Sequence, residues 1–273
     1  MSRYYPPNYY SFGQISYKHH PLKIFFKKEL IKYRVFKQNS LLGRILSLKY
    51  REPEDFYPWF EKTKLNFNSA ILDVGCGSGL LLLKLRKSGF TNVSGIDPFI
   101  EKEINYEGGV TVYKKSLSEV AGQYDLIIFN HALEHMPNQK EALQLAYSLL
   151  KRGGCILVRV PVAGTYAWKT YGVNWVQLDA PRHLFIHTVA SMKLLATQVG
   201  FSRVDTVFDS WDLQFWGSEQ YLKDIPLRDK RSYGELYDES LFTKKQIQDF
   251  RDRAKALNKQ NDGDAAAFFL FKQ

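Results

Sequence analysis

A chain of 273 residues, 45% of them hydrophobic, is long enough to bury the core of one large α/β domain with additions. It contains no run of about 18 apolar residues and no apolar segment of the kind that a signal peptide needs, so we expect neither a transmembrane helix nor export. The two cysteines, Cys76 and Cys155, fall in predicted core segments, which favours reduced thiols and a cytoplasmic location.

Residues 1–55 are predicted to form an N-terminal arm, and residues 56–273 the main domain. The net charge is +10, and ten Lys or Arg against a single acid, Glu29, give the segment from Lys18 to Arg51 a charge of +9. The apolar residues interleaved with these cations include Leu22, Phe25, Phe26, Leu30, Tyr33 and Ile45. A solvated or core-packing helix face explains such a stretch, and so does peripheral contact with an anionic membrane or lipid carrier at the inner membrane surface. A nucleic-acid partner is not expected.

The segment Ile71–Gly79, ILDVGCGSG, is predicted to be a buried strand that leads into a glycine loop. Gly75, Gly77 and Gly79 stand at every second position, and glycine permits positive φ and close approach of a ligand to the main chain. A helical pattern follows over Leu80–Phe90. Strand, glycine loop and helix form a common nucleotide cradle, although an ordinary turn between strand and helix has the same pattern.

A second strand, within NVSGIDPF, ends on Asp97 about twenty residues later. Its carboxylate can accept hydrogen bonds from both ribose hydroxyls of an adenosine, while an Asx turn before Pro98 would also use an aspartate here. A dinucleotide site requires G-x-G-x-x-G, but Leu80 stands where the last glycine should be. The acid before the loop, Asp73, suits a ligand with a cationic amino group and no pyrophosphate, such as S-adenosylmethionine.

At these two motifs the sequence resembles the class I S-adenosylmethionine-dependent methyltransferases. YDLIIFNHALEHM, from Tyr124, is similar to the family's fourth strand and its loop, and LLKRGGCILVRVP, from Leu149, to the fifth strand. PRHLFIHT, residues 181–188, and YYPPNYYSF, residues 4–12, resemble segments of bacterial methyltransferases linked to surface-polysaccharide and sugar biosynthesis. The resemblance implies a methyltransferase with S-adenosyl-L-methionine as its cofactor.

The expected fold is a doubly wound, mostly parallel, seven-stranded sheet with an antiparallel last strand, a Rossmann-like methyltransferase fold. Strands are expected near residues 70–74, 93–97, 110–113, 125–129, 155–160, 203–208 and 265–272. Residues 210–262, with a helix over Thr243–Lys259, are expected to be a helical insertion or cap between the last two strands.

Ligands of such sheets bind outside the carboxyl ends of the strands, so Asp73, Asp97, Asn130 and Pro161 are expected around one crevice. Ser116 is the expected adenine contact, although many relatives carry an acid in that region. The predicted cofactor-binding residues are Asp73, Gly75, Cys76, Gly77, Gly79, Asp97, Pro98, Ser116, Asn130 and His131.

Two polar clusters supply candidate bases, His135 and His183. Methyl transfer from a sulfonium is an in-line displacement that depends on positioning, and an alcohol acceptor must also lose a proton, which a histidine can take. In the structural alternative, Glu134 and His135 brace one loop, while Arg182 and His183 brace or cap another.

No metal is predicted. H-x-x-E-H over residues 131–135 matches a zinc-protease motif, but that motif needs a helix and Pro137 follows closely. Ubiquinone-biosynthesis O-methyltransferases have a similar loop, with an acid three residues before the Glu-His pair and a proposed divalent ion. His131 occupies the acid's position here.

The sequence therefore predicts an S-adenosylmethionine-dependent methyltransferase acting on an oxygen of a small-molecule or glycan acceptor. An NAD-dependent oxidoreductase, disfavoured by Leu80, and a non-catalytic module that binds an adenosyl ligand are the alternatives. No particular oligomeric state is predicted.

Overall fold

The computed structural model describes residues 10–13, 15–50, 57–236 and 241–273. Residues 4–9 of the YYPPNYYSF segment lie outside the described residues. The chain divides into two compact units, each discontinuous in sequence. The first unit comprises residues 1–130, 141–157 and 269–273, and the second comprises residues 131–140 and 158–268. The boundaries predicted at residues 55 and 56 stay a prediction.

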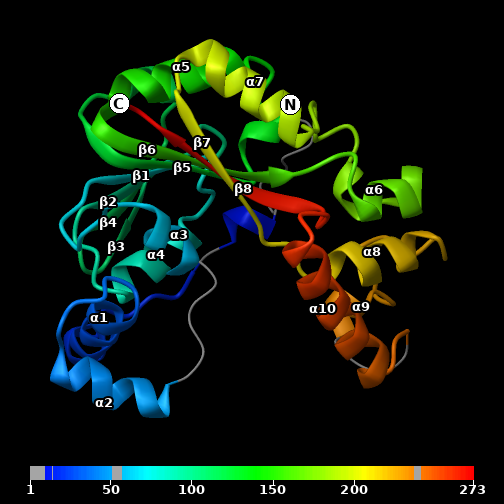
Figure 1. Ribbon diagram of the computed structural model, residues 1–273, viewed down its shortest axis with the longest axis horizontal. Coiled ribbons are helices and arrows are strands. Elements are labelled where there is room, and N and C mark those ends of the chain that lie inside the picture. The colour runs from blue at the N-terminus through cyan, green and yellow to red at the C-terminus, as the bar shows by residue number, and fades with distance from the viewer. Residues whose placement is uncertain (1–9, 14, 51–56, 237–240) are drawn as a thin grey trace. The chain divides into compact units, whose positions relative to one another are not determined.

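Eight strands within the described residues form one sheet in the order β3-β4-β2-β1-β5-β6-β8-β7 (Figure 1). The strands are β1 (Ile71–Val74), β2 (Val93–Ile96), β3 (Ile104–Tyr106), β4 (Val110–Tyr113), β5 (Tyr124–Asn130), β6 (Leu150–Pro161), β7 (Arg203–Phe208) and β8 (Ala265–Phe271). Strand β1 pairs in parallel with β2 and β5, and β2 pairs in parallel with β4. Strand β8 runs antiparallel to β6. Backbone hydrogen bonds join Gly153 to Lys272 at one end of the pair and Val162 to Asp264 at the other, so the residue numbers rise in opposite directions. The expected fold class is confirmed.

One strand was not expected from the sequence. Strand β3 pairs antiparallel with β4, from Ile104 opposite Val112 to Tyr106 opposite Val110. It has only three residues and none is fully buried, so it lacks the apolar run that marks the other strands. Gly108 and Gly109, both with positive φ, form the turn of this hairpin. The predicted count of seven strands was therefore one too low.

Helices and 3-10 turns connect these strands. The bounds are η2 (Tyr10–Phe12), α1 (Pro21–Arg34), α2 (Leu41–Lys49), α3 (Tyr57–Lys62), α4 (Leu80–Lys87), η3 (Leu117–Glu119), η4 (Leu133–His135), α5 (Gln139–Leu149), α6 (Tyr166–Tyr171), η5 (Gly172–Asn174), η6 (Val176–Leu178), α7 (Val189–Val199), α8 (Leu213–Tyr221), α9 (Tyr233–Leu236) and α10 (Lys244–Lys259). No helix among the described residues is both long and apolar enough to cross a membrane.

Helix α10 begins and ends almost where the sequence predicted. Its N-cap, Thr243, accepts a hydrogen bond from the backbone of Gln246 at 3.2 Å, and the Gln246 side chain accepts one from the backbone of Thr243 at 2.9 Å. This capping box satisfies two backbone donors that the first turn would otherwise leave without a partner.

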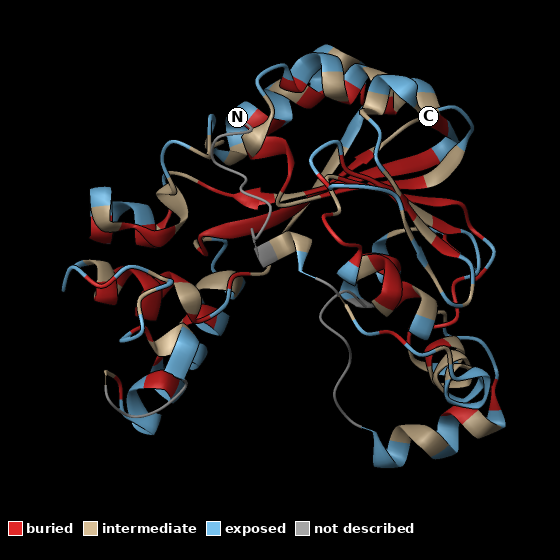
Figure 2. Ribbon diagram, turned by 180° about the vertical axis from the view of Figure 1, so that it is seen from behind, coloured by how far each residue is buried: buried red, intermediate tan, exposed pale blue. Residues whose placement is uncertain are grey.

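Each unit has its own apolar core. In the first unit every residue of β1 is buried, and the rings of Phe60, Phe67 and Phe90 pack beside one another. In the second unit an aromatic cluster joins Trp175 to α8 and α10, with the rings of Phe215 and Phe250 stacked 5.4 Å apart. Figure 2 shows that most strands of the sheet and the inner faces of these helices are buried, whereas β3 and β7 are partly exposed. The predicted insertion thus contributes α8 and α10 to the core of its unit.

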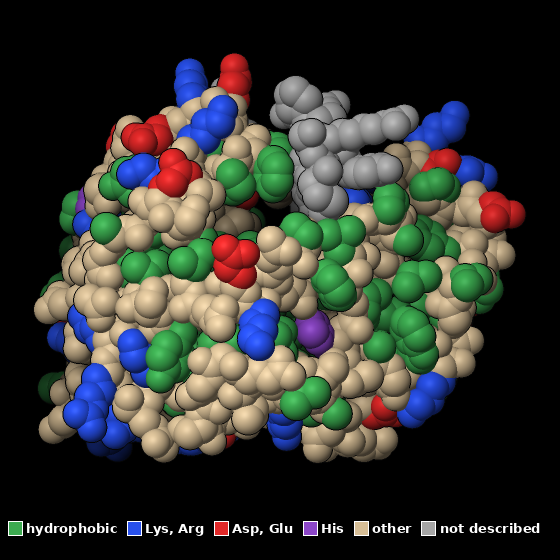
Figure 3. All heavy atoms as spheres, turned by 90° about the horizontal axis from the view of Figure 1, so that it is seen from above, with side chains coloured by type: hydrophobic (Ala, Val, Ile, Leu, Met, Phe, Trp, Pro, Cys, Tyr) green, Lys and Arg blue, Asp and Glu red, His purple; other side chains and the backbone are tan. Residues whose placement is uncertain are grey.

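On the face drawn in Figure 3, the charged side chains are scattered and form no single patch. On that face Lys and Arg side chains stand in several separate places among apolar and uncharged groups. The drawn face offers no continuous basic strip of the kind that follows a phosphate backbone.

Helices α1 and α2 form a hairpin in the first unit, visible at the blue end of the chain in Figure 1. Gly43 of α2 faces α1 so closely that a Cβ there would lie 2.2 Å from the carbonyl oxygen of Glu29. The hydroxyl of Ser40 caps α2 by accepting from the backbone of Gly43 at 2.9 Å, and it donates to the Glu29 carboxylate at 2.7 Å. The sequence did not reveal this packing, which fixes the two helices against each other.

We predict that Gly43→Ala destabilises the hairpin, although alanine favours a helix over glycine by about 1 kcal/mol. The new Cβ would meet backbone atoms of Glu29, which cannot move without separating the helices, and overpacking of this kind costs about 1–3 kcal/mol. Amide hydrogen exchange in α2 should therefore become faster. Ser47→Ala in the same helix is the control and should change exchange little. Slower exchange in Gly43→Ala would contradict the close packing.

Candidate active site

The glycine loop after β1 has the backbone conformation that the sequence predicted. Gly75, Gly77 and Gly79 have φ of 73°, 54° and 86°, a region that residues with a Cβ rarely adopt. Gly79 is the N-cap of α4. The loop therefore turns directly from a buried strand into a helix N-terminus, the general arrangement of nucleotide-binding loops.

An N-terminal segment packs on this loop, and sequence reasoning missed it. The carbonyl oxygen of Ser11, in η2, accepts hydrogen bonds from the backbone N–H of Ser78 at 2.8 Å and from its hydroxyl at 3.0 Å. A Cβ on Gly77 would lie 2.5 Å from that same oxygen. Gly77 is therefore required by the approach of η2. No local pattern signals a contact between residues that lie 67 positions apart in the chain.

Asp97, at the end of β2, accepts two backbone hydrogen bonds. Its Oδ2 accepts from Gly77 and its Oδ1 from Phe99, each at 2.9 Å. The second bond is the Asx turn that the sequence offered as an alternative to ribose binding. The two roles are compatible, because each carboxylate oxygen keeps a further lone pair. Burial raises the pKa of Asp97, and the two N–H donors oppose that rise.

Asp73 is buried in β1, and the influences on its carboxyl group are its burial and the nearby charge of Asp97. Burial, followed by the charge of Asp97, raises the pKa of Asp73 to about 8. A buried carboxylate is costly unless it is paired, and a ligand ammonium group would be such a partner. Asn130, at the end of β5, has a buried Oδ1 with no partner among the described residues. These residues fit the amino group and polar atoms of S-adenosylmethionine.

Cys76 and Ser116 have structural partners. The Cys76 sulfur packs against Gly95, where a Cβ would lie 2.5 Å from it, and burial raises the pKa of the Cys76 thiol. Ser116 caps η3, and its hydroxyl donates to the Glu119 carboxylate at 2.6 Å. Pro98 lies exposed in the turn after β2. The adenine contact expected of Ser116 and the cofactor contacts expected of Cys76 and Pro98 stay predictions.

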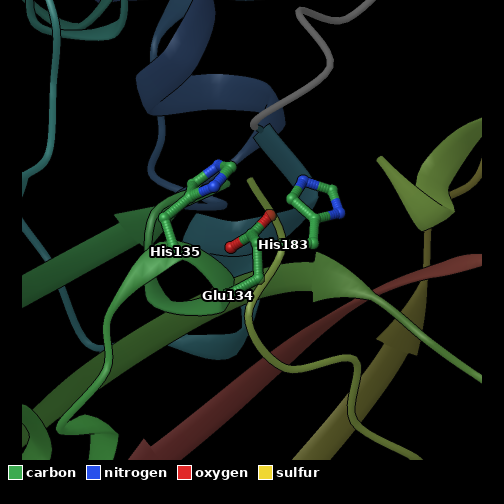
Figure 4. A group of neighbouring side chains, drawn as sticks. All are labelled: Glu134, His135 and His183. Atoms are coloured by element: carbon green, nitrogen blue, oxygen red, sulfur yellow. The ribbon is translucent and has the colours of Figure 1, made fainter. Parts of the chain in front are cut away.

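In the second unit a buried carboxylate lies among histidines. Glu134, in η4, is 1% exposed, and Figure 4 shows its side chain pointing between the rings of His135 and His183. One ligand atom from each of these three residues lies within 4.8 Å of the other two. His131 Nδ1 lies 3.3 Å from Glu134 Oε1, close enough for an ion pair although not aligned as a hydrogen bond. Burial by itself would raise the pKa of Glu134, but the histidines, His131 foremost, hold it below its ordinary value.

Backbone contacts bring the two polar segments of the sequence together. The N–H groups of Leu184 and Phe185 both donate to the carbonyl oxygen of Glu134, at 2.9 and 3.3 Å. His131 has a positive φ of 53°, and its N–H donates to the carbonyl of Arg159 at 2.8 Å. The chain therefore turns sharply after β5 and presents Glu134 to the segment that carries His183.

Hydrogen-bond partners fix the tautomers of the histidines. His183 Nδ1 lies 2.7 Å from the carbonyl oxygen of Gln177, and His135 Nδ1 lies 3.0 Å from that of Arg182. A carbonyl oxygen only accepts, so both Nδ1 atoms carry the proton and both Nε2 atoms are unprotonated in the neutral rings. Burial lowers the pKa of His183. His183 is therefore neutral near pH 7 and has a lone pair with which to take a proton.

His131 differs from these two residues. The guanidinium of Arg159, itself paired with Asp209 at 2.6 Å, hydrogen-bonds Nε2 of His131. Because a guanidinium only donates, the proton of His131 stays on Nδ1, facing Glu134. His131 thus supports the Glu134 carboxylate, and its expected cofactor contact stays a prediction. This relay from Asp209 to Glu134 was not visible in the sequence, since its members come from separate segments.

The same group of side chains could hold a metal ion. Glu134, His135 and His183 offer one carboxylate and two imidazoles, a donor set that suits zinc or iron better than magnesium. Carbonyl groups that fix the second ring nitrogen are also common behind metal-ligating histidines. The absence of a metal expected from the sequence stays a prediction.

The family of the chain follows from its match to a family model. Residues 48–206, more than half of the chain, match the model described as "Methyltransferase domain". The chain therefore belongs to this family of methyltransferases. The class I S-adenosylmethionine-dependent methyltransferase predicted from the sequence motifs is confirmed, and with it the enzyme class and the cofactor.

Individual relatives are more distant. The ubiquinone biosynthesis O-methyltransferase of Bordetella avium is 31% identical over 145 residues, 46% of this chain and 58% of that protein. The mitochondrial enzyme of the same name from Rattus norvegicus is 28% identical over 162 residues, 45% of this chain and 46% of that protein. The chain thus spans about half the length of these curated relatives.

A solved structure shows the same fold. Mycolic acid cyclopropane synthase CmaA1, in a crystal structure complexed with SAH and CTAB, superposes with a TM-score of 0.51 at 14% identity, over 94% of this chain and 99% of that one. This likeness concerns the fold alone. The relatives described here do not support the link to surface-polysaccharide biosynthesis.

We predict that Asp73 makes the cofactor-free protein less stable as the pH rises. Its pKa is about 8 in the folded state and about 3.9 in an unfolded chain, so the folded state keeps a proton that the unfolded state has lost. This stabilisation is complete below about pH 4 and is lost as the pH rises towards 8. Relative to Asp73→Asn, the unfolding free energy of the parent protein should fall by on the order of 1 kcal/mol per pH unit, measured by urea denaturation. If the unfolding free energies of the parent and of Asp73→Asn changed with pH in the same way, Asp73 would already be ionised in the folded protein.

Proposed function

We propose that the protein transfers the methyl group of S-adenosylmethionine to an oxygen atom of a small-molecule acceptor. The observation that carries the proposal is a neutral, buried His183 beside the ionised Glu134, an arrangement suited to removing a proton from a hydroxyl group. The relatives support oxygen as the target, because both are named O-methyltransferases.

The cofactor is assigned to residues of the first unit. Asp73 is proposed to pair with the ammonium group of the cofactor and Asp97 to bind its ribose, and the glycine loop is proposed to hold the turn between these two carboxylates. Asn130 offers an acceptor that has no other partner among the described residues. When bound, the cofactor supplies an electrophilic methyl group, and the residues of the chain hold it and exclude water.

His183 is proposed as the base and Glu134 as the group that stabilises its charged form. When His183 Nε2 takes the acceptor's proton, the ring becomes an imidazolium ion beside a carboxylate that is already ionised. His135, whose ring centroid is 4.7 Å from that of His183, is the second candidate.

The finer expectations from the sequence remain separate proposals. A sugar or glycan acceptor rests on the PRHLFIHT and YYPPNYYSF segments alone, since the relatives do not support it. Peripheral contact with an anionic membrane rests on α1 and α2 and does not depend on the relatives.

We predict that Asp97→Ala weakens binding of S-adenosylmethionine about 10- to 100-fold, because hydrogen bonds to a charged group contribute about 1.5–3 kcal/mol. Isothermal titration calorimetry measures this, and NAD should not bind. Asp97→Asn, which keeps one carbonyl oxygen for Gly77 or Phe99, should lose less. Asp252→Asn on the exposed face of α10 is the control. Unchanged affinity in Asp97→Ala would remove the ribose assignment, and tight binding of NAD would favour an oxidoreductase.

We predict that His183→Ala lowers kcat about 10²- to 10⁴-fold with little change in cofactor affinity. The acceptor is first found by mass spectrometry of cell-extract metabolites incubated with enzyme and labelled cofactor. In the parent enzyme, kcat/KM should fall only below the ordinary histidine pKa of about 6.5, because burial lowers that of His183.

His187→Ala is the matched control for this variant. Both ring nitrogens of His187 already have partners, Gln139 at 2.6 Å and Ser191 at 3.0 Å, so its loss should cost far less in rate. Full activity in both His183→Ala and His135→Ala would remove the acid–base mechanism. Inactivation by a chelator with recovery on adding magnesium, zinc or iron(II) would replace it with a metal-assisted one.

A further inference from the structure

The α1–α2 hairpin exposes apolar side chains that no step of methyl transfer uses. On α2, Leu41, Ile45 and Leu48 are 74%, 57% and 75% exposed, and their spacing of four and then three residues places them on one face of the helix. On and beside the hairpin the exposed large apolar side chains are Leu22, Phe25, Phe26, Tyr33, Leu41, Ile45, Leu48 and Tyr50. Exposed apolar residues gathered in this way mark an interaction surface.

The same segment is strongly basic. Over residues 15–50 the cationic side chains are Lys18, Lys23, Lys27, Lys28, Lys32, Arg34, Lys37, Arg44 and Lys49. The single acid of this segment, Glu29, is used inside the hairpin, where it pairs with Lys32 and accepts from the hydroxyl of Ser40. The outer surface of α1 and α2 therefore combines positive charge with apolar groups and carries no acid of its own.

Packing within the α1–α2 hairpin keeps its apolar and cationic side chains exposed to solvent. Ile31 of α1 is fully buried, which fixes the inner face of that helix. Close contact at Gly43 and a hydrogen bond of 2.7 Å from Arg34 to the carbonyl of Ser47 join α1 to α2. Rotating α2 to bury Leu41 and Leu48 would break both contacts, so the apolar face is a fixed feature of the folded protein.

We propose that the α1–α2 hairpin is a docking surface for an anionic lipid bilayer. A bilayer satisfies both kinds of side chain at once, since anionic headgroups attract the cations and the acyl boundary takes up the apolar groups. A nucleic acid would leave the apolar face of α2 without a partner. A second copy of the chain would bring two strongly positive surfaces together. The hairpin would lie on the membrane, because neither helix is long enough to span it, and this proposal does not depend on the methyl-transfer proposal.

Co-sedimentation with vesicles tests the surface. The full chain should partition onto vesicles of phosphatidylglycerol at low salt, be released at high salt, and bind phosphatidylcholine vesicles at least tenfold more weakly. Leu41→Ser/Ile45→Ser/Leu48→Ser should lower partitioning at least tenfold, and so should Lys23→Gln/Arg44→Gln/Lys49→Gln. Leu194→Ser, which replaces an exposed leucine of α7, is the matched control and should bind as the parent does.

Two further measurements show whether the triple variants are still folded and still bind the cofactor. Circular dichroism and cofactor affinity should be unchanged in both triple variants, since all six positions are exposed. Equal binding to both kinds of vesicle, no binding to either, or parent-like binding by the triple variants would overturn the proposal. Sedimentation velocity that shows a dimer abolished by the apolar variant, with no vesicle binding, would assign the face to a second copy. Binding of duplex DNA without binding of vesicles would also overturn it.

Discussion

The cost of burying a carboxylate at the end of a strand is the constraint on which the functional regions depend. Asp73 lies in β1, Asp97 directly follows β2, and Glu134 lies in η4 in the segment after β5, and all three are buried. The cost of burial is offset in a different way for each of the three carboxyl groups. Asp97 takes backbone N–H groups, Glu134 is surrounded by imidazoles, and Asp73 keeps a proton. The first fixes a turn, the second sets an ionised carboxylate beside the histidines, and the third leaves a carboxyl group with which a cation could pair.

Local patterns in the sequence were enough to predict most of the fold. Apolar runs located the long strands, glycine spacing located the loop after β1, and Thr243 located the start of α10. Strand β3 escaped prediction because its three residues, none of them buried, form no apolar run, and its pairing depends on β4.

The sequence predicted which residues belong to the candidate site, but it did not predict which of them contact one another. His135 and His183 were singled out for their chemistry, but their meeting at Glu134 depends on backbone bonds from Leu184 and Phe185, made over about fifty positions. The protonated nitrogen of His135 is likewise set by the carbonyl of Arg182, 47 positions away. Contacts of this kind leave no periodic signal, so only the folded chain reveals them.

The contact between Ser11 and the glycine loop has a practical consequence for handling the protein. A shortened version that starts beyond residue 11 would lose the carbonyl that accepts from both the N–H and the hydroxyl of Ser78, at the entrance to α4. Ligand affinities measured on such a version would describe an altered loop. An affinity tag is therefore better fused after Gln273, and a protease that trims the first dozen residues during purification would change the enzyme being assayed.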